Sequence, residues 1–268
     1  MRRPRRIVAL GGHEFRLRSP ELAILQHVLT LTAADSPRIC LLPTAGGDAR
    51  DGISDFYAAA DRFDCKPTHV SLFRLEHERV DLRRHLLEQD MIYVAGGSLL
   101  NLLAIWRAHG LPELLTEAWR SGVVLCGQSA GALCWFDHGI TASAGPPRPA
   151  RGLGLLRGSL CVHYARDPAR RKAFLDAVGA GLPGGWGIDD GAGIVFEAGH
   201  APVALAGRER ARVIRVEAID GRVREIIENP RLLDYKDHAA SDPALAERAL
   251  LRRAPTRTAI RGAFARLR

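Results

Sequence analysis

The stretch Val123-Val124-Leu125-Cys126-Gly127-Gln128-Ser129-Ala130-Gly131-Ala132 decides the fold class of this chain. A β-branched apolar run leads into Gly-Gln-Ser-Ala-Gly and then into helix-forming residues, which predicts a strand, a sharp turn and a helix with Ser129 at the corner. Gly127 and Gly131 leave room for backbone to pass close to this turn. The pattern is typical of a nucleophile elbow, which projects a serine hydroxyl from the edge of a sheet.

Two backbone N–H groups are predicted beside this serine. Ala130 opens the expected helix, where N–H groups have no acceptor within the helix. The pair Gly96-Gly97 follows a strand expected at 91–95, and that strand should neighbour the elbow strand. A backbone N–H of this pair would complete an oxyanion hole with that of Ala130. A tight strand-to-helix turn is the alternative explanation for the pair Gly96-Gly97.

Strands and helices alternate through the first half of the chain. Strands are expected at 5–10, 38–42, 68–73 and 91–95, and helices at 19–32, through 56–63, and at 81–89, 99–108 and 113–120. This order predicts a three-layer α/β fold with a doubly wound, mainly parallel sheet. Ligands of such sheets bind beyond the carboxyl ends of the strands, where Ser129 would lie.

The second half of the chain has a different pattern. The segment 139–157 contains Gly-Pro-Pro-Arg-Pro and predicts a long irregular loop that would cover or line the site. A short strand is expected at 160–162 and a helix at 168–178. Between 193 and 227, short apolar runs predict additional antiparallel strands near the C-terminus.

The composition bounds the class of protein. The chain has 268 residues, of which 47% are hydrophobic and 25% charged, which is ordinary for a globular protein. We expect one catalytic domain over 1–240 and an arginine-rich tail over 241–268 that begins as a helix. The five cysteines show no Cys-x-x-Cys spacing, so neither a disulfide framework nor a zinc site is indicated.

Charge and hydropathy argue against nucleic-acid and membrane partners. The formal net charge is +8, but the cations are almost all arginines and many lie at the two ends, as expected for a chain-wide bias rather than a binding patch. No apolar run approaches the roughly 20 residues that span a bilayer. The basic N-terminus lacks the apolar core of a signal peptide, so we expect a cytoplasmic protein.

A serine nucleophile needs a base, and one of the ten histidines is well placed to supply it. His163 ends the strand expected after the elbow and is therefore the candidate base. His138 should lie at the far end of the elbow helix, away from Ser129. His13 follows the first strand and is a candidate for the wall of the pocket.

The residue that orients the base is less clearly indicated. Asp137 ends the expected elbow helix, Asp167 follows His163, and Asp189 and Asp190 lie in a turn bounded by glycines. Each of them could equally be a helix cap or a turn residue, which is the commoner role of aspartate beside glycine.

These motifs together resemble the peptidase E family of serine peptidases, which includes α-aspartyl dipeptidases and the related cyanophycinases. The similarity runs in order from about Ile7 to about Asn229. It rests on Gly127–Ala132, Val94–Ser98, Asn101–Leu103, Val162–Tyr164 and Gly187–Gly191.

The resemblance implies a class I glutamine amidotransferase-like fold, in which serine replaces the usual cysteine. It also implies a Ser-His-acid triad without a metal or an organic cofactor. Ser129 then matches the nucleophile, His163 the base, and Gly97 and Ala130 the oxyanion donors.

The chain departs from the dipeptidases at the third member of the triad. That family carries the acid on the loop after the elbow helix, where this chain has Thr-Ala-Ser at 141–143. Asp137 is the nearest carboxylate and is our prediction for this role, with Asp190 as the reserve.

Aspartyl specificity also needs a cation for the substrate carboxylate. Arg170 and Arg171 lie near the corresponding region and are predicted to bind it, and Gln128 beside the serine is predicted to contact the substrate.

The sequence therefore predicts a serine exopeptidase that hydrolyses dipeptides with an N-terminal aspartate. A small peptide is the expected partner, and a homodimer is left open. The alternatives are a cyanophycinase-like peptidase, an α/β-hydrolase esterase and a non-catalytic binding protein on the same scaffold. The esterase is disfavoured because the chain lacks a His-Gly-Gly-Gly motif. A glutaminase is excluded because the nucleophile is not cysteine and Ala165 stands where glutamate would follow His163.

Overall fold

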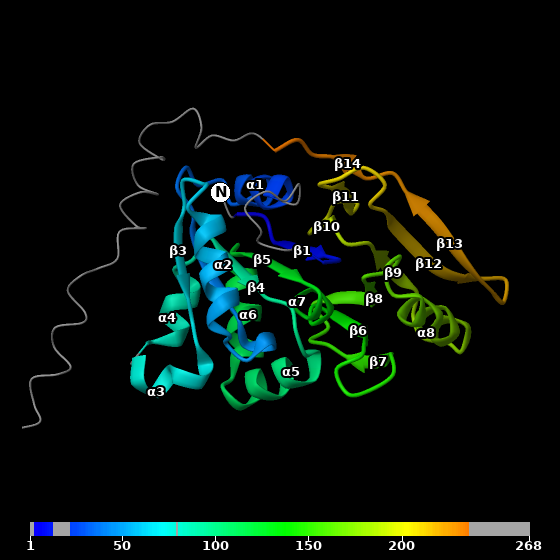
Figure 1. Cartoon of the computed structure of the whole chain (residues 1–268), viewed down its shortest axis with the longest axis horizontal. Coiled ribbons are helices and arrows are strands. Elements are labelled where there is room, and N and C mark those ends of the chain that lie inside the picture. Colours follow the sequence, from blue (N-terminus) through cyan, green and yellow to red (C-terminus); the bar gives the residue numbers. More distant parts are fainter. Residues whose placement is uncertain (1–2, 13–21, 79, 236–268) are drawn as a thin grey trace, which may run out of the picture.

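Two β-sheets lie side by side in the computed structural model, which describes residues 3–12, 22–78 and 80–235 (Figure 1). His13, the start of the helix expected from residue 19, and the expected helix of the tail lie outside the described residues. The larger sheet has the strand order β14 (Arg231–Leu232), β11 (Val203–Ala206), β10 (Ala192–Glu197), β1 (Arg6–Leu10), β5 (Val124–Gln128), β4 (Met91–Val94), β2 (Arg38–Leu42) and β3 (Lys66–His69).

The centre of this sheet is parallel, from β1 through β5, β4 and β2 to β3. Strands β10 and β11 continue it in antiparallel pairing. The central strands are buried on both faces, which explains why β5 reads as a continuous apolar run rather than an alternating one. The predicted α/β fold with a mainly parallel sheet is confirmed.

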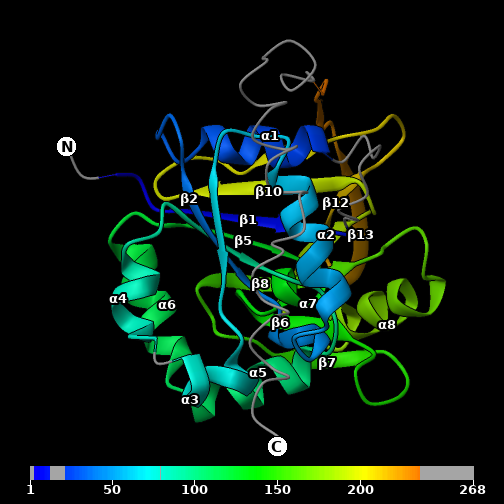
Figure 2. The same cartoon turned by 60° about the vertical axis from the view of Figure 1, so that its left-hand side comes forward.

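Helices cover both faces of this sheet. Val8 and Cys126 face α1 (Leu22–Thr30) and α2 (Arg50–Ala60), whereas Ala9 and Leu125 face the opposite layer. Neighbouring residues of a strand point to opposite faces, so the two layers share the same strands. The opposite layer is formed by α4 (Leu82–Leu87), α5 (Leu99–Ala108) and α6 (Leu111–Arg120). Figure 2 shows α1 on one side of β1 and β5 and the α4 and α6 pair on the other.

The smaller sheet was only partly expected. Its order is β13 (Arg222–Glu228), β12 (Val213–Ile219), β9 (Gly185–Ile188), β8 (Leu156–Val162), β6 (Phe136–Thr141) and β7 (Arg148–Arg151). Helix α8 (Pro168–Gly179) packs on it through Phe174 and Val178, which contact an apolar group that includes Ile214. The sequence predicted the antiparallel pair β12 and β13 but not a separate sheet.

Two predictions about the segment after the elbow were wrong. The elbow helix α7 spans only Ala130–Leu133, and the chain then enters β6, so His138 lies on a strand. The segment 139–157 is a hairpin of β6 and β7 followed by the start of β8, not an irregular loop. Its prolines are compatible with a strand because β7 is at the edge of the sheet, where a missing N–H breaks no ladder.

Two shorter differences concern β3 and the remaining helices. β3 ends at His69 rather than at 73, and a 3₁₀ turn, Leu72–Arg74, takes over before the short helix α3 (Leu75–Glu78). A second 3₁₀ turn, Thr44–Gly46, follows β2. In the described part of the chain, every helix is too short or too polar to cross a membrane.

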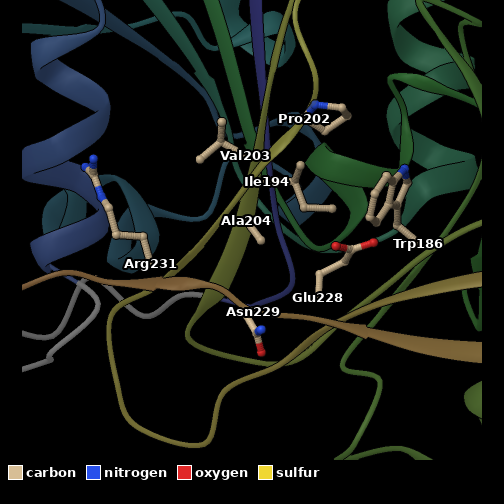
Figure 3. Close-up of a pocket in the computed structure, with 8 residues that line it drawn as sticks. All are labelled: Trp186, Ile194, Pro202, Val203, Ala204, Glu228, Asn229 and Arg231. Atoms are coloured by element: carbon tan, nitrogen blue, oxygen red, sulfur yellow. The ribbon is translucent and has the colours of Figure 1, made fainter.

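A cavity of about 250 Å³ marks the junction of the two sheets (Figure 3). Trp186 of β9, Ile194 of β10 and Glu228 of β13 line it, and the Trp186 ring packs edge-on against Phe196 with centroids 6.1 Å apart. The two sheets are therefore joined here by an aromatic contact.

Replacement of Trp106 should show how much the α5 layer stabilises the fold. Trp106 is fully buried, lies against Trp135, and its indole N–H donates to Thr44 Oγ1 at 3.3 Å. We expect Trp106→Ala to lower the free energy of unfolding by about 3–5 kcal/mol. Urea unfolding would measure the loss. Phe73→Ala, at a side chain that is 57% exposed, should change the free energy of unfolding by less than about 0.5 kcal/mol. Equal losses of this free energy in the two variants would show that burial of Trp106 does not stabilise the fold.

Candidate active site

Ser129 occupies a strained turn between β5 and α7. Its backbone angles are φ 51° and ψ −116°, a conformation that non-glycine residues rarely adopt. Residues held in such strained conformations cluster at functional sites. The flanking glycines are required by close packing. A Cβ on Gly127 would lie 2.1 Å from the Gly131 carbonyl oxygen, and one on Gly131 would lie 2.3 Å from the Val94 carbonyl oxygen. The turn therefore has the geometry of a nucleophile elbow.

Three side chains form a hydrogen-bonded line at this turn. Ser129 Oγ lies 2.9 Å from Nε2 of His163, and Nδ1 of the same ring contacts Oδ1 of Asp190. The side chains of His163 and Asp190 are 13% and 16% exposed, so substrate can reach them while most of the line is shielded from water. With Nδ1–H donating to the carboxylate, Nε2 is free to accept the serine proton.

The chain after β1 holds Asp190 against His163. Gly191 N–H donates to the Gly12 carbonyl at 3.0 Å. A Cβ on Gly12 would lie 2.2 Å from Asp190 Oδ1 and 2.8 Å from His163 Cε1. Only glycine can pass here without moving the two side chains apart.

Asp189 anchors the same turn to the segment that carries the histidine. Its carboxylate is buried and accepts hydrogen bonds from Ala165 N at 2.9 Å, Arg212 N at 3.0 Å and Arg212 Nε at 3.1 Å. Ala165 lies two residues after His163, which itself has a left-handed φ of 57°. Asp189 therefore fixes the position of the histidine loop relative to Asp190.

Two arginines surround Asp190. Arg166 Nη1 lies 2.9 Å from Asp190 Oδ2, and Arg208 donates through Nε and Nη2 to the Asp190 carbonyl at 3.1 and 2.7 Å. Burial alone would raise the pKa of Asp190. The hydrogen bond from His163 and the positive charges of Arg166 and Arg208 outweigh burial, and the pKa lies below its ordinary value. Asp190 is thus held as a carboxylate.

The loop after β4 lies directly against the serine. A Cβ on Gly96 would be 3.2 Å from Ser129 Cβ. Gly97 has φ 144°, and a Cβ there would overlap the Ala45 carbonyl oxygen at 2.1 Å, so only glycine fits. In the described part of the chain, no hydrogen bond links the N–H of Gly97 or Ala130 to another group. Both amides remain available to an oxyanion.

The structure does not bring Asp137 to His163. Asp137 lies on β6, and its Oδ2 accepts the Gly158 N–H at 2.9 Å within the smaller sheet. The prediction of Asp137 as the third side chain failed because the elbow helix is one turn long and the chain then leaves the site as a strand. Asp190, the reserve, takes that place. Asp167 caps α8 by accepting the Arg170 N–H at 3.1 Å.

The predicted cations of the substrate pocket are bound elsewhere. Arg170 Nε lies 3.0 Å from Asp167 Oδ2. Arg171 donates through Nε to Glu225 at 3.0 Å and lies over the Tyr164 ring. Neither guanidinium is directed to Ser129 by these contacts.

The side chain of Gln128 is held by a hydrogen bond from Tyr93. Its Oε1 accepts a hydrogen bond from the hydroxyl of the buried Tyr93 at 3.1 Å, which fixes the amide beside the serine. A contact of Gln128 with substrate stays a prediction.

Sequence reasoning missed Gly12, Arg166 and Arg208. The pair Gly11-Gly12 after the first strand was a usable signal, because close packing is a common reason for two adjacent glycines. The arginines gave no signal in so arginine-rich a chain. Within residues 3–12, 22–78 and 80–235, no cluster of three or more His, Cys, Asp or Glu side chains is arranged to hold a metal ion.

Comparison with known proteins fits this geometry. A sequence model of peptidase family S51 matches residues 7–203. The chain belongs to this family. The uncharacterized peptidase YgaJ of Bacillus subtilis (strain 168) is 40% identical over 223 residues, which cover 83% of this chain and 96% of that protein. Membership of family S51 makes the chain a serine peptidase, and the predicted resemblance to the peptidase E family is confirmed.

Solved structures share the S51 fold at lower identity. A peptidase from an acI-B1 Actinobacterium matches with a TM-score of 0.65 and 18% identity over 87% of this chain and 98% of that chain. A putative Peptidase E protein from Listeria monocytogenes EGD-e matches with a TM-score of 0.56 and 16% identity over 76% and 98%. These similarities support the arrangement of the elements around Ser129.

The ion pair of Arg171 with Glu225 should make stability of this S51 peptidase depend on pH. The hydrogen bond from Arg171 lowers the pKa of Glu225 below its ordinary value. A depressed carboxyl pKa contributes stability above the pKa of the unfolded chain, and this contribution is lost as pH falls through the lower folded value. We therefore expect Glu225→Gln to reduce Tm at pH 7 and to approach the wild type below about pH 4.

Thermal unfolding between pH 3 and pH 8 would test this. Asp176→Asn removes an exposed carboxylate that pairs with Lys172 on the same helix, and it should have little effect at any pH. A Tm difference between wild type and Glu225→Gln that stays constant across the range would contradict the role of the pair.

Proposed function

We propose that this chain is an exopeptidase that removes an N-terminal aspartate from dipeptides through Ser129, His163 and Asp190. The observation that carries the proposal is the line of hydrogen bonds from Ser129 Oγ through His163 to Asp190. Membership of family S51 supplies the class of bond, and the geometry supplies the groups that would break it.

The proposed reaction has two halves, acylation of Ser129 and hydrolysis of the acyl-enzyme, and His163 acts in both. His163 takes the hydroxyl proton as Ser129 Oγ attacks the peptide carbonyl, and the N–H groups of Gly97 and Ala130 stabilise the oxyanion. The imidazolium then protonates the leaving amine as the C–N bond breaks. In the second half, water attacks the acyl-enzyme as His163 takes one of its protons, and His163 then returns this proton to Ser129 Oγ as the ester C–O bond breaks and aspartate leaves. Asp190 keeps the imidazole in the required tautomer and stabilises its cation.

Selection of an acidic first residue rests on the charge around the histidine. Arg166 and Arg208 both contact Asp190, and the Arg166 side chain is 67% exposed. An exposed guanidinium at the mouth of the site favours a substrate that carries a carboxylate. Arg170 and Arg171, which sequence reasoning favoured for this role, are paired with Asp167 and Glu225, which lie outside the Ser129–His163–Asp190 line, whereas Arg166 is paired with Asp190 itself.

A non-catalytic binding role loses its main support. That alternative was motivated by the missing aspartate after the elbow helix. Asp190 provides a carboxylate at the same histidine nitrogen from another loop, so the site needs no residue at 141–143.

Hydrolysis of a dipeptide panel would test the proposal. The wild type should cleave Asp-Leu in preference to isoaspartyl-Leu, Glu-Leu and Ala-Leu. Ser129→Ala should lower kcat by at least about 10⁴-fold because the nucleophile is lost, with an unchanged Tm. Retained turnover in Ser129→Ala would rule out the mechanism. Equal cleavage of Asp-Leu and Ala-Leu would rule out selection of an acidic first residue but would leave the mechanism in place.

Paired aspartate variants would identify the acid. Asp190→Asn should lower kcat about 10³- to 10⁴-fold, because the amide favours the wrong tautomer of His163. Asp137→Asn should keep kcat within about threefold and act only on stability, since Asp137 bonds backbone in the smaller sheet. Steady-state kinetics on Asp-Leu would measure both. The reverse result would restore Asp137 as the third member.

A further inference from the structure

A second cavity opens on the same edge of the larger sheet as Ser129. It has a volume of about 400 Å³ and lies between the loops that follow β2 and β3. We call it the β2–β3 pocket. The residues of its lining that carry the argument are Arg50, Ile53, Phe73 and Arg74.

The lining of the β2–β3 pocket carries more positive than negative charge. Arg50 and Arg74 have no carboxylate partner in the described part of the chain, whereas Arg83 and Arg84 do. The one carboxylate in the lining belongs to Asp48. Its Oδ2 accepts hydrogen bonds from Ser71 Oγ at 2.6 Å and Phe73 N at 3.4 Å, which hold it in the loop. Two guanidinium groups at one cavity favour an anionic ligand, and a carboxylate matches their fork of donors.

The same pocket presents apolar surface. The Phe73 side chain is 57% exposed, which makes it one of the few large apolar side chains of the described residues that face solvent. Ile53 of α2 lines the cavity with it. A pocket with both an apolar surface and two guanidinium groups matches a ligand residue that has an apolar side chain and a carboxylate. The C-terminal residue of a peptide has this chemistry.

The loop after β2, which borders the pocket, packs directly against the Gly96–Ser98 loop beside Ser129. Ser98 N donates to the Ala45 carbonyl at 2.8 Å. A Cβ on Gly46 would lie 3.5 Å from the Gly96 carbonyl oxygen, and Gly96 itself lies against Ser129. β2 is two strands from β5, or about 10 Å at about 4.8 Å per strand. An extended peptide rises about 3.4 Å per residue, so this distance corresponds to roughly three residues.

The strand order also gives the direction in which a bound peptide would run along this edge of the sheet. Asp190, with Arg166 bound to it, precedes β10, which lies beyond β1 on one side of β5. The β2–β3 pocket lies on the other side of β5. A peptide with its first residue at Arg166 would cross Ser129 and continue toward Arg50 and Arg74.

We propose that the β2–β3 pocket binds the free C-terminal residue of a tripeptide or tetrapeptide substrate. The terminal carboxylate pairs with Arg50 and Arg74, and the side chain of that residue packs on Phe73. This inference rests on the proposed cleavage at Ser129 and extends it beyond dipeptides, to peptides that end in an apolar residue with a free carboxylate.

The test compares free acids with C-terminal amides. Asp-Ala-Leu and Asp-Ala-Ala-Leu, each as acid and as amide, would be assayed for release of aspartate. We expect the wild type to show a kcat/KM for the acid about tenfold above that for the amide for at least one of the two lengths. In Arg50→Gln/Arg74→Gln the ratio should fall to about one. The matched control is Arg222→Gln/Arg224→Gln, which removes two exposed charges from β13 and should keep the wild-type ratio.

Phe73→Ala tests the apolar part separately. The wild type should prefer a C-terminal leucine to glycine in the tripeptide, and this preference should shrink in Phe73→Ala. Because Phe73 is exposed, a folding defect is not expected, and its Tm provides the check.

Binding to the Ser129→Ala variant makes the result independent of turnover. Calorimetric titration of this variant with Asp-Ala-Leu and Asp-Ala-Ala-Leu should give a Kd about tenfold lower for the acid than for the amide at the preferred length, and the difference should vanish when Arg50 and Arg74 are also replaced by Gln. Equal acid and amide affinities at both lengths, or a difference that survives the two replacements, would overturn the pocket assignment. Normal discrimination in binding with no hydrolysis by the wild type would instead refute the proposed function and leave the pocket in place.

Discussion

The contact between the chain after β1 and the turn before β10 is the constraint on which the site depends. Gly12 leaves no space between its backbone and the side chains of Asp190 and His163, and Gly191 bonds back to its carbonyl. Side chains held by packing on several sides keep one geometry without further ordering on binding, which is the requirement for a preorganised site. Asp189, buried beside Asp190, extends the same constraint to the histidine loop.

The two sheets divide the chemistry between them. Ser129 and the Gly97 loop come from the parallel larger sheet, whereas His163 follows β8 of the smaller sheet. The hydrogen-bonded line from Ser129 through His163 to Asp190 therefore forms where the sheets meet. Hydrogen bonds from the turn between β9 and β10, which belong to different sheets, hold His163 and the residues that follow it. This arrangement explains why the third carboxylate can come from that turn rather than from the segment after the elbow.

The arginine bias of the chain has a structural consequence that composition alone hides. Many arginines form ion pairs on the surface, such as Arg83 with Glu117 and Arg171 with Glu225, and their guanidinium groups are therefore occupied by side chains of the protein itself. The arginines that we propose to contact substrate differ from these in location. Arg166 lies at Asp190, and Arg50 and Arg74 line a cavity on the same edge of the sheet.

The sequence by itself determined the parallel sheet, the elbow turn at Ser129 and the position of His163 directly after a strand, because these follow from local patterns: apolar runs, glycines at a tight turn, and a histidine at the end of a strand. It did not determine the smaller sheet, since Gly-Pro-Pro-Arg-Pro at 145–149 suggested a loop and only the position of β7 at an edge makes a strand with Pro149 acceptable there. Nor did it decide between Asp137 and Asp190. That choice depends on which residues distant in sequence the fold brings to His163, and Asp190 reaches it because Gly12, far away in the chain, allows the two loops to touch. Tertiary structure alone decided that contact, because the packing of two backbones against each other leaves no periodic signal in either segment.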